Sequence, residues 1–399
     1  MSTTRSVTNT MTASYRIVTP MFCSGADPAK AELRLHSIKG AIRYWWRSLA
    51  WGQVKDAKSI QDLEASIFGA ANDHGQSKIR LRLVTEKTSL DKQVSRGERL
   101  GEGELKGANY FGYGVSKSGQ LTRPMIPGGK FTLEVRFSPS LDDQTIATIR
   151  RALILLGTVG GLGSKSRKGY GSLTLTSIDG AAPDQMDPVS LIQTAVKAFP
   201  DSKPDWNAWS RASRIITVTS QTKDALQLLD SIGQEQIYFR SWGHKGNVLG
   251  AEREANFKRD HDMSKKPSSH KSPPDRIAFG LPHSYGKGDS NDVKPQGHDR
   301  RGSSLFIHVH QSDPDSQATG VLAFLPSRLL PDGEKIKAFG NLMDYSKSED
   351  FWYPVHAFLD RLVGNGDKPA DRPGYEKLGS NPDWWQKRTE LIGTEVNLG

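Results

Sequence analysis

The spacing of apolar residues predicts alternating strands and helices in the first half of the chain. Ile79–Thr85 and Phe131–Phe137 alternate apolar and polar residues at period two, which is typical of half-buried strands. Apolar residues at Ile146, Ile149 and Leu153 instead follow a helical spacing. The predicted elements are the strand Tyr15–Phe22, the helix Ile38–Ala50, the strands Ile79–Thr85 and Phe131–Phe137, the helix Asp142–Val159 and the strand Ser172–Ile178.

This order of strand, helix, strand, strand, helix, strand is the order of the ferredoxin-like fold, which RRM proteins also use. We therefore predict an N-terminal ferredoxin-like domain over residues 1–190. Residues 88–130 are too long for a plain connection between two strands and are interpreted as an insertion. Residues 191–213 are interpreted as a linker.

The sequence of the second half predicts a more degenerate copy of the same fold over residues 214–365, so the predicted fold class is α+β. A long polar segment, Arg240–Arg301, interrupts it and holds five of the ten histidines; we expect it to form no core of its own. Residues 366–399 are interpreted as a tail. The elements predicted here are the strands Arg214–Thr219, Leu305–Val309 and Val321–Leu325 and the helices Asp224–Ile232 and Trp352–Leu362.

The composition narrows the classes of protein that fit. A single cysteine, Cys23, excludes an internal disulfide bond, and no apolar run is long enough to cross a membrane. The N-terminus has no apolar stretch of the kind found in signal peptides, so a cytoplasmic location is expected. A formal charge of +10 favours a polyanionic partner, although it could equally serve solubility.

The predicted first helix carries a basic face. Ile38, Ile42 and Trp45 fall on one side, and no acidic residue occurs between Arg34 and Arg47. Ser37 is expected to cap the helix, whose N-terminus would favour phosphate. A merely solvated basic face is the alternative, but like charges at this spacing repel one another. The candidate phosphate-binding residues are Ser37, Lys39, Gly40, Arg43 and Arg47.

A glycine-rich, basic stretch follows the second predicted helix at Gly160–Gly171. It contains no acid, and its glycines would let backbone N–H groups approach an anion. The spacing fits neither a P-loop nor a dinucleotide-binding motif, because Gly169 is followed by Tyr170 and then by a strand. A flexible turn is the alternative. The candidate RNA-binding residues are Gly161, Gly163, Ser164, Lys165, Ser166, Arg167 and Lys168.

Two short motifs flank the long polar segment and give weaker signals. FRSWGHKG begins at Phe239 and DRRGSSL begins at Asp299. Their bases are candidates for phosphate contacts and their tryptophan for stacking on a nucleobase, though each residue could simply be exposed. The candidates are Arg240, Trp242, His244, Lys245, Arg300 and Arg301.

Catalytic and metal chemistry have little support in the sequence. Cys23 has no partner at metal-ligand spacing, and His308 and His310 share a strand face, which is usually structural. The DHD triplet Asp260–Asp262 could hold a metal, but one such triplet is expected by chance. We therefore predict no catalytic residue, no metal and no cofactor.

The basic helix and the glycine-rich loop together resemble those of the RAMP superfamily. Val18–Ala50 is more closely similar to the N-terminus of RAMP subunit one of type III-B (Cmr) CRISPR effector complexes. Further similar motifs follow in the order of that family, although a proline is expected before Leu305 and is absent. These motifs are YFGYG (Tyr110–Gly114), IPGGKF (Ile126–Phe131), FRSWG (Phe239–Gly243), FKRDHD (Phe257–Asp262) and RRGSSLFIHVH (Arg300–His310).

The resemblance implies two ferredoxin-like domains in a non-catalytic subunit that binds the 3′ part of the guide RNA and its target RNA. It also implies other RAMP subunits of the complex as partners, and antiviral defence as the role. Two alternatives stay open: a metal-independent endoribonuclease that processes guide-RNA precursor with His36, and a purely structural cap of the complex.

Overall fold

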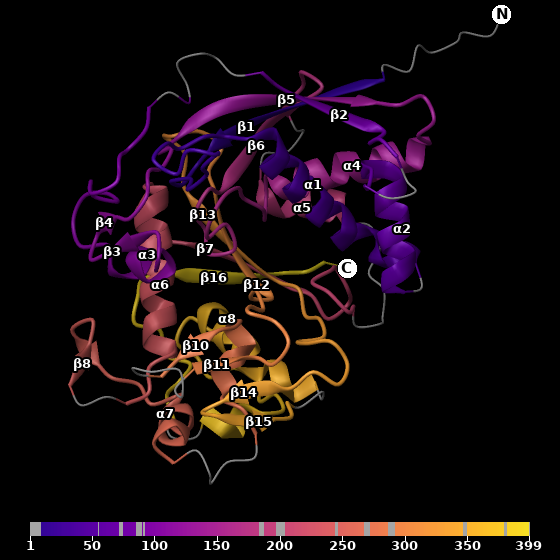
Figure 1. Ribbon diagram of the computed structural model, residues 1–399. Helices are drawn as coiled ribbons and strands as arrows, with labels where there is room; N and C mark the ends of the chain where they lie inside the picture. The colour runs from indigo at the N-terminus through magenta and orange to yellow at the C-terminus, as the bar shows by residue number, and fades with distance from the viewer. Residues whose placement is uncertain are drawn as a thin grey trace, which may run out of the picture.

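The computed structural model describes residues 9–54, 56–71, 75–84, 90, 92–182, 187–196, 204–243, 246–266, 272–285, 292–345, 349–378 and 381–398. Its helices and strands form two ferredoxin-like units that pack closely together (Figure 1). The predicted α+β fold class is therefore confirmed.

The first sheet has the strand order β2-β5-β1-β6, and every neighbouring pair is antiparallel. This is the strand order of the ferredoxin-like fold, whose outer strands are the second and fourth in sequence. Tyr15, Leu133 and Val135 are buried beneath the helices, whereas Arg80 and Arg136 lie on the exposed outer face. The strands are β1 (Thr10–Ile17), β2 (Ile79–Val84), β5 (Gly129–Phe137) and β6 (Leu173–Ile178).

Helices cover only the inner face of this sheet (Figure 1). The first helix begins at Leu35, not Ile38, and its N-cap, Arg34, makes no side-chain hydrogen bond. The predicted capping role of Ser37 is therefore wrong; Ser37 is exposed in the first turn. The sequence analysis missed two helices, although an aspartate caps each of them. The helices are α1 (Leu35–Ala50), α2 (Ala57–Phe68), α4 (Asp143–Leu156) and α5 (Pro188–Ala195).

The second sheet repeats the topology with the order β12-β13-β7-β16, again all antiparallel. Its fourth strand, β16, lies in the stretch that the sequence predicted to be a tail. The helices that follow its first and third strands are α6 (Ala225–Phe239) and α8 (Tyr353–Val363). The strands are β7 (Arg214–Thr219), β12 (Leu305–His310), β13 (Thr319–Phe324) and β16 (Ile392–Val396).

Three strands of this second sheet, β12, β13 and β7, are buried on both faces, whereas the edge strand β16 is largely exposed. Ile215, Phe306 and Val321 belong to the hydrophobic core of the first unit, where the Phe306 ring lies 5.4 Å from that of Trp45. On the opposite face, Ile216 and Ile307 pack into a second core together with α6 and α8. All six residues of β12 are buried, as expected for a strand covered on two sides. The two units therefore share one continuous interior.

A buried network of ion pairs and hydrogen bonds holds the segment before β16 in place. Arg361 of α8 is fully buried and binds Glu235 of α6 at 2.6 Å and Glu254 at 2.6 Å. The same guanidinium donates to the backbone carbonyl of Trp384 at 2.9 Å. Because paired, fully hydrogen-bonded charges are tolerated in an interior, this network anchors the chain that leads to β16.

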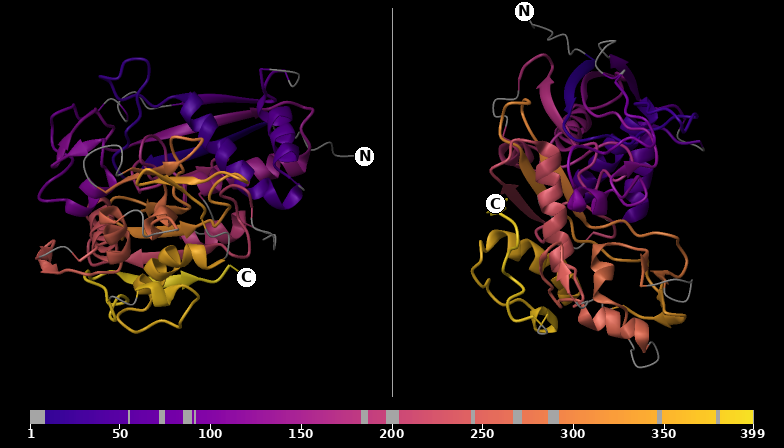
Figure 2. Two further views of the ribbon diagram at one scale, coloured as in Figure 1. Left: turned by 60° about the horizontal axis from the view of Figure 1, so that its bottom comes forward. Right: turned by 90° about the vertical axis from the view of Figure 1, so that its left-hand side faces the viewer.

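The two insertions also pack onto the fold. The first carries α3 (Lys106–Phe111), whose Gly107 lies against Gly233 of α6 so closely that a Cβ on either glycine would collide with backbone atoms. Residues 240–301 were expected to form no core of their own; the structure shows that they pack Phe257 and Phe279 into the second core, which they share with α6 and α8. The β8–β9 hairpin of this insertion protrudes (Figures 1 and 2). The remaining elements are β3 (Ser116–Lys117), β4 (Gln120–Leu121), β8 (Asn247–Val248), β9 (Ala251–Glu252), α7 (Lys258–Lys265), β10 (His283–Ser284), β11 (Asp292–Pro295), β14 (Ile336–Ala338) and β15 (Asn341–Met343).

Candidate functional site

The glycine-rich loop Gly160–Gly171 lies in the seam between the two units. The backbone N–H of Ile307 in β12 donates to the carbonyl of Arg167 at 3.1 Å, and Ser164 N–H donates to the carbonyl of Phe22 at 2.8 Å. The Val309 N–H of β12 donates to the Ser172 hydroxyl at 3.1 Å. The loop therefore joins the outer edge of the second sheet to the first unit, and it is not a flexible turn.

Packing explains most of the glycines in this loop. A Cβ on Gly160 would lie 2.4 Å from the Trp45 indole nitrogen, and one on Gly171 would lie 2.0 Å from the Leu162 carbonyl oxygen. Gly163 and Gly171 also have φ angles of +84° and +61°, a region that favours glycine. Anion binding is therefore not needed to account for them.

The basic face of α1 is partly neutralised by a residue from α2. Glu64 is buried and accepts hydrogen bonds from Arg43 at 2.5 Å and from Arg47 at 2.7 Å. Lys39 donates to the Phe68 carbonyl at 2.9 Å, and burial, followed by the nearby Arg43, lowers the pKa of its ammonium group. The absence of acids within α1 is therefore a misleading signal, because the counter-ion comes from another helix.

One hollow does bring α1 and the loop together. It encloses about 420 Å³ and is lined by Ser37 and Ala41 of α1 and by Gly161, Gly163 and Ser164 of the loop; we call it the Ser37 hollow. The loop therefore lies beside the Ser37 side of α1. Lys39 and Arg43 lie on the other side, towards α2.

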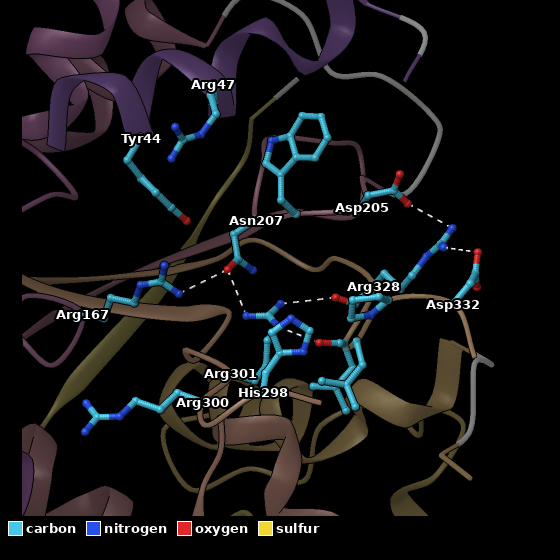
Figure 3. A pocket seen from close by; sticks show the side chains of 14 residues that line it. Tyr44, Arg47, Arg167, Asp205, Asn207, His298, Arg300, Arg301, Arg328 and Asp332 are labelled. Carbon is cyan, nitrogen blue, oxygen red and sulfur yellow. Dashed lines mark hydrogen bonds and ion pairs between the residues drawn. The ribbon is translucent and has the colours of Figure 1, made fainter. Parts of the chain in front are cut away.

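A second and larger hollow, the arginine pocket, opens where the two units meet. It encloses about 470 Å³ and takes residues from α1, the loop, the segment before β7 and the segments around β12 and β13 (Figure 3). Its lining residues are Tyr44, Arg47, Arg167, Asp205, Trp206, Asn207, His298, Arg300, Arg301, Arg328, Leu329, Leu330, Pro331 and Asp332.

The charges in the arginine pocket are unbalanced. Arg328 is neutralised by Asp205 at 3.0 Å and by Asp332. Among the described residues, Arg167 and Arg301 donate only to neutral oxygens. Both bond to Asn207 Oδ1 at 3.2 Å, and Arg167 reaches the Ser303 carbonyl at 2.8 Å while Arg301 reaches the Leu329 carbonyl at 2.7 Å. Burial and the nearby Arg167 lower the pKa of Arg301 to about 10.

Arg300 is the third arginine of the pocket, after Arg167 and Arg301, without a carboxylate partner: it is exposed and forms no ion pair with any described residue. It lies close enough to Lys165 for the two positive charges to repel, and burial followed by Arg300 and Arg123 lowers the pKa of Lys165. Arg123 of the first insertion also donates to the Ser164 hydroxyl at 3.3 Å. A basic surface thus links the arginine pocket to the rim of the Ser37 hollow.

The pocket also holds buried polar donors without partners. The Tyr44 hydroxyl and the Trp206 indole nitrogen are buried, and neither forms a hydrogen bond with the described residues. Figure 3 shows the Tyr44 side chain directed towards Arg167 and Asn207. Because buried donors are almost always paired, these groups are available to a bound acceptor such as a phosphate oxygen.

The structure separates the candidate residues of the two short motifs, FRSWGHKG and DRRGSSL, that flank the long polar segment. Arg300 and Arg301 line the arginine pocket, whereas Arg240 and Trp242 line a separate hollow at the end of α6. The Trp242 indole stacks on His261, with ring centroids 3.5 Å apart. Lys168 is also turned inward, towards Phe111. His244 and Lys245 lie outside the described residues.

Several lining residues were missed by sequence reasoning. Asn207 and Trp206 lie in the predicted linker, and Arg328 follows β13; none belongs to a basic cluster. Tyr44 lies within the quoted helix motif but was not singled out. Arg123, which lies near the arginine pocket, stands three residues before Ile126, the start of the IPGGKF motif, but was not singled out either. The missing information was therefore which residues lie close together in three dimensions.

The groups considered for catalysis have structural partners. Asp260 is buried and accepts from the backbone N–H groups of Asp275 and Arg276 at 2.8 and 2.9 Å; burial and the nearby Asp275 raise its pKa to about 6. His308 bonds to the Gly160 carbonyl at 2.6 Å. Within the described ranges, His, Cys, Asp and Glu residues form no group of three that could hold a metal ion.

Residues 14–174 match the family model of the RAMP superfamily, so the predicted resemblance is confirmed over the first unit. Two curated relatives come from Pyrococcus furiosus. The CRISPR system Cmr subunit Cmr1-1 is 30% identical over 148 residues, which are 36% of this chain and 40% of that protein. Cmr1-2 is 25% identical over 170 residues, which are 39% of this chain and 89% of that protein. The chain thus aligns with less than half of the first relative's length.

Two solved structures are similar as well. The apo form of Pyrococcus furiosus Cmr1 has a TM-score of 0.48 and 17% identity, and the match covers 87% of this chain and 96% of that one. A subunit of the type III-B Cmr-β complex bound to cognate target RNA has a TM-score of 0.46 and 13% identity, and the match covers 81% of this chain and 96% of that one.

Among the described residues, every helix is too short or too polar to cross a membrane.

Proposed function

We propose that this chain is a non-catalytic, RNA-binding subunit of a type III-B CRISPR effector complex. The observation that carries the proposal is the arginine pocket, where Arg167, Arg300 and Arg301 gather without a carboxylate partner among the described residues. Guanidinium groups favour phosphate because their planar donors match its oxygens. Support for the kind of complex comes from the Cmr names of the relatives over the first unit.

The bound RNA in this proposal is the 3′ part of the guide RNA and its duplex with target RNA. Its backbone crosses the seam, contacts the arginine pocket and continues past Lys165 and Arg123 towards the Ser37 hollow. Contacts of this kind are to phosphates, so binding depends little on sequence. Other RAMP subunits of the complex are the proposed protein partners.

The deciding experiment incubates the purified chain with labelled mature guide RNA and with guide precursor over a series of salt concentrations. We expect both RNAs to be bound and neither to be cut, with the logarithm of the affinity falling by about 0.7 per phosphate contact for each tenfold rise in salt. Affinity that is insensitive to salt would contradict the phosphate-binding model. Cleavage of the precursor that is lost on His36→Ala would instead support the endoribonuclease alternative.

A further inference from the structure

A third hollow lies at the C-terminal end of α6, where the insertions of both units meet. It encloses about 340 Å³, within the usual range of small-molecule sites, which is about 300–1,000 Å³. Tyr110 from α3 and Arg240 and Trp242 from the end of α6 line it, together with Val248 of β8, Arg276 and His283. We call it the α6 pocket.

The two guanidinium groups of the α6 pocket have buried donors without partners. The Nε atom of Arg240 is buried and forms no hydrogen bond with the described residues. The same is true of two nitrogens of Arg276, its Nε and one terminal nitrogen. Arg240 donates through another nitrogen to the Tyr110 hydroxyl at 2.5 Å. The carboxylate nearest Arg276, that of Asp260, is 3.9 Å away and already accepts two backbone N–H groups.

A third cation lies beside these two. The Lys168 ammonium is buried, has no hydrogen-bond partner among the described residues and lies 5.6 Å from the centre of the Phe111 ring. Burial, then Arg240, Arg276 and Lys168, lowers the pKa of His283 to about 3, so that its imidazole is neutral at physiological pH. The guanidinium charges of Arg240 and Arg276 thus lie near a single carboxylate, and the buried Lys168, whose pKa is lowered by burial to about 7, adds a charge that is only partly present at neutral pH. An anionic ligand would balance this positive charge.

The other walls of the α6 pocket suit a planar ring. His261 covers one face of the Trp242 indole, and the indole also lines the pocket. Tyr110 and the side chain of Val248 add an aromatic and an apolar surface. Aromatic side chains beside cations are the combination that holds a single nucleotide, because the base stacks while the phosphate is neutralised.

We propose that the α6 pocket binds one nucleotide of a single-stranded RNA, with its phosphate at Arg240 and Arg276 and its base against Trp242 and Tyr110. This inference rests on the proposed RNA-binding function and adds to it a dedicated pocket away from the arginine pocket. The same chemistry would accept a free nucleoside monophosphate, so the test separates the two sources.

The test titrates the full chain calorimetrically with UMP, with AMP and with inorganic phosphate. We expect the monophosphates to bind at least tenfold more tightly than phosphate, because only they offer a base. Arg240→Gln should weaken this binding at least tenfold. The matched control Arg80→Gln removes an exposed arginine from the outer face of the first sheet, outside both pockets, and should leave mononucleotide binding within twofold of the parent. Arg300→Gln reports instead on binding of the mononucleotide at the arginine pocket.

A second variant tests the pocket without removing charge. Val248→Trp, in the short β8 strand, should fill the hollow and abolish mononucleotide binding while the melting temperature stays close to that of the parent. Equal affinity for phosphate and the monophosphates, or no binding of either at millimolar concentration, would overturn the proposal. Loss of binding in Arg300→Gln but not in Arg240→Gln would overturn it too.

The same titrations with guide RNA identify the source and keep the two proposals apart. If guide RNA binds and Arg240→Gln weakens both RNA and mononucleotide, the pocket takes a nucleotide of the RNA. If the wild type binds mononucleotides but no guide RNA, the proposed RNA-binding function fails and the RNA source of the nucleotide fails with it. If the guide binds and mononucleotides do not, only the pocket proposal fails.

Discussion

Arg167 and Arg301 both donate a hydrogen bond to the same atom, the side-chain oxygen Oδ1 of Asn207, at 3.2 Å each. One residue comes from the loop of the first unit and the other from the segment before β12 of the second. A single neutral amide oxygen therefore brings together two positive charges that would otherwise repel each other. A phosphate placed beside them would relieve that repulsion, since it supplies the missing negative charge.

The exposed Arg300 provides the most direct test of the arginine pocket. Arg300→Gln should weaken guide-RNA binding about three- to tenfold and reduce the log–log salt slope by about 0.7, because an exposed charge contributes modestly and one phosphate contact is lost. Fluorescence anisotropy over a salt series measures both effects. The matched control is Arg328→Gln, in the same pocket but already paired with Asp205 and Asp332. An equal loss of affinity in both variants would show that the pocket acts only through its total charge.

Glu64 should stabilise the fold by holding the basic face of α1. Glu64→Gln leaves Arg43 and Arg47 without their buried counter-ion and is expected to lower the free energy of unfolding by about 1–2 kcal/mol, a modest value because both arginines are about one-third exposed. Urea denaturation measures this change. Glu104→Gln, at an exposed acid paired with Lys106, is the control and should change stability by less than about 0.5 kcal/mol.

Replacing either of two glycines, Gly40 or Gly171, with alanine should change the stability of the chain, and in opposite directions. Gly40 lies in α1 with open space around it, so Gly40→Ala should stabilise the chain by about 0.5–1 kcal/mol through helix propensity. Gly171 has a φ of +61° and no room for a Cβ, so Gly171→Ala should destabilise by more than about 1 kcal/mol.

Thermal and urea denaturation of the Gly40→Ala and Gly171→Ala variants check these signs. If Gly40→Ala is stabilising yet weakens RNA binding, the open surface of α1 is used by the RNA. A stable Gly171→Ala variant would contradict the packing account of the loop.

Lys168 should make stability depend on pH. Burial, followed by Arg240 and Lys165, lowers the pKa of its ammonium group from 10.5 to about 7 in the folded chain. The unfolded chain then binds more protons than the folded chain between pH 7 and about 10.5, so this group makes stability rise over that window. Below pH 7 both states are protonated and the full cost of the buried charge applies.

Lys168→Met isolates this contribution, because the other titrating groups are common to both proteins. The variant should exceed the wild type in unfolding free energy most strongly below pH 7, and the difference should shrink towards pH 10. Urea denaturation at pH 6.5, 8 and 9.5 provides the comparison. A difference that does not change with pH would mean that Lys168 titrates at its ordinary pKa.

The fold was more accessible from the sequence than the site. The predicted ends of the strands β2 and β5 and of the helix α4 lie within a few residues of the observed ends. Each of these elements has one buried face and therefore a clear period of apolar residues. The strand β16 was missed because IGTEV is short and sits far from its partner β7 in a stretch rich in glycine and proline. Only long-range pairing marks it as a strand.

The candidate site shows the corresponding limit. The basic positions of α1 and the loop were recognised from their charge, but charge alone does not reveal which cations are already neutralised. Glu64 and Asp205 belong to segments remote in sequence from the arginines that they bind. Equally, Tyr44 and Asn207 carry no charge signal, and only the folded seam brings them beside Arg167.

The burial of three strands of the second sheet on both faces has a mechanical consequence. Because β12, β13 and β7 contribute side chains to both hydrophobic cores, the two units cannot swing apart without exposing that shared interior to water. The Ser37 hollow, the arginine pocket and the α6 pocket are therefore held at fixed separations. A chain-like ligand that contacts more than one of these hollows would therefore have to span a fixed distance between them.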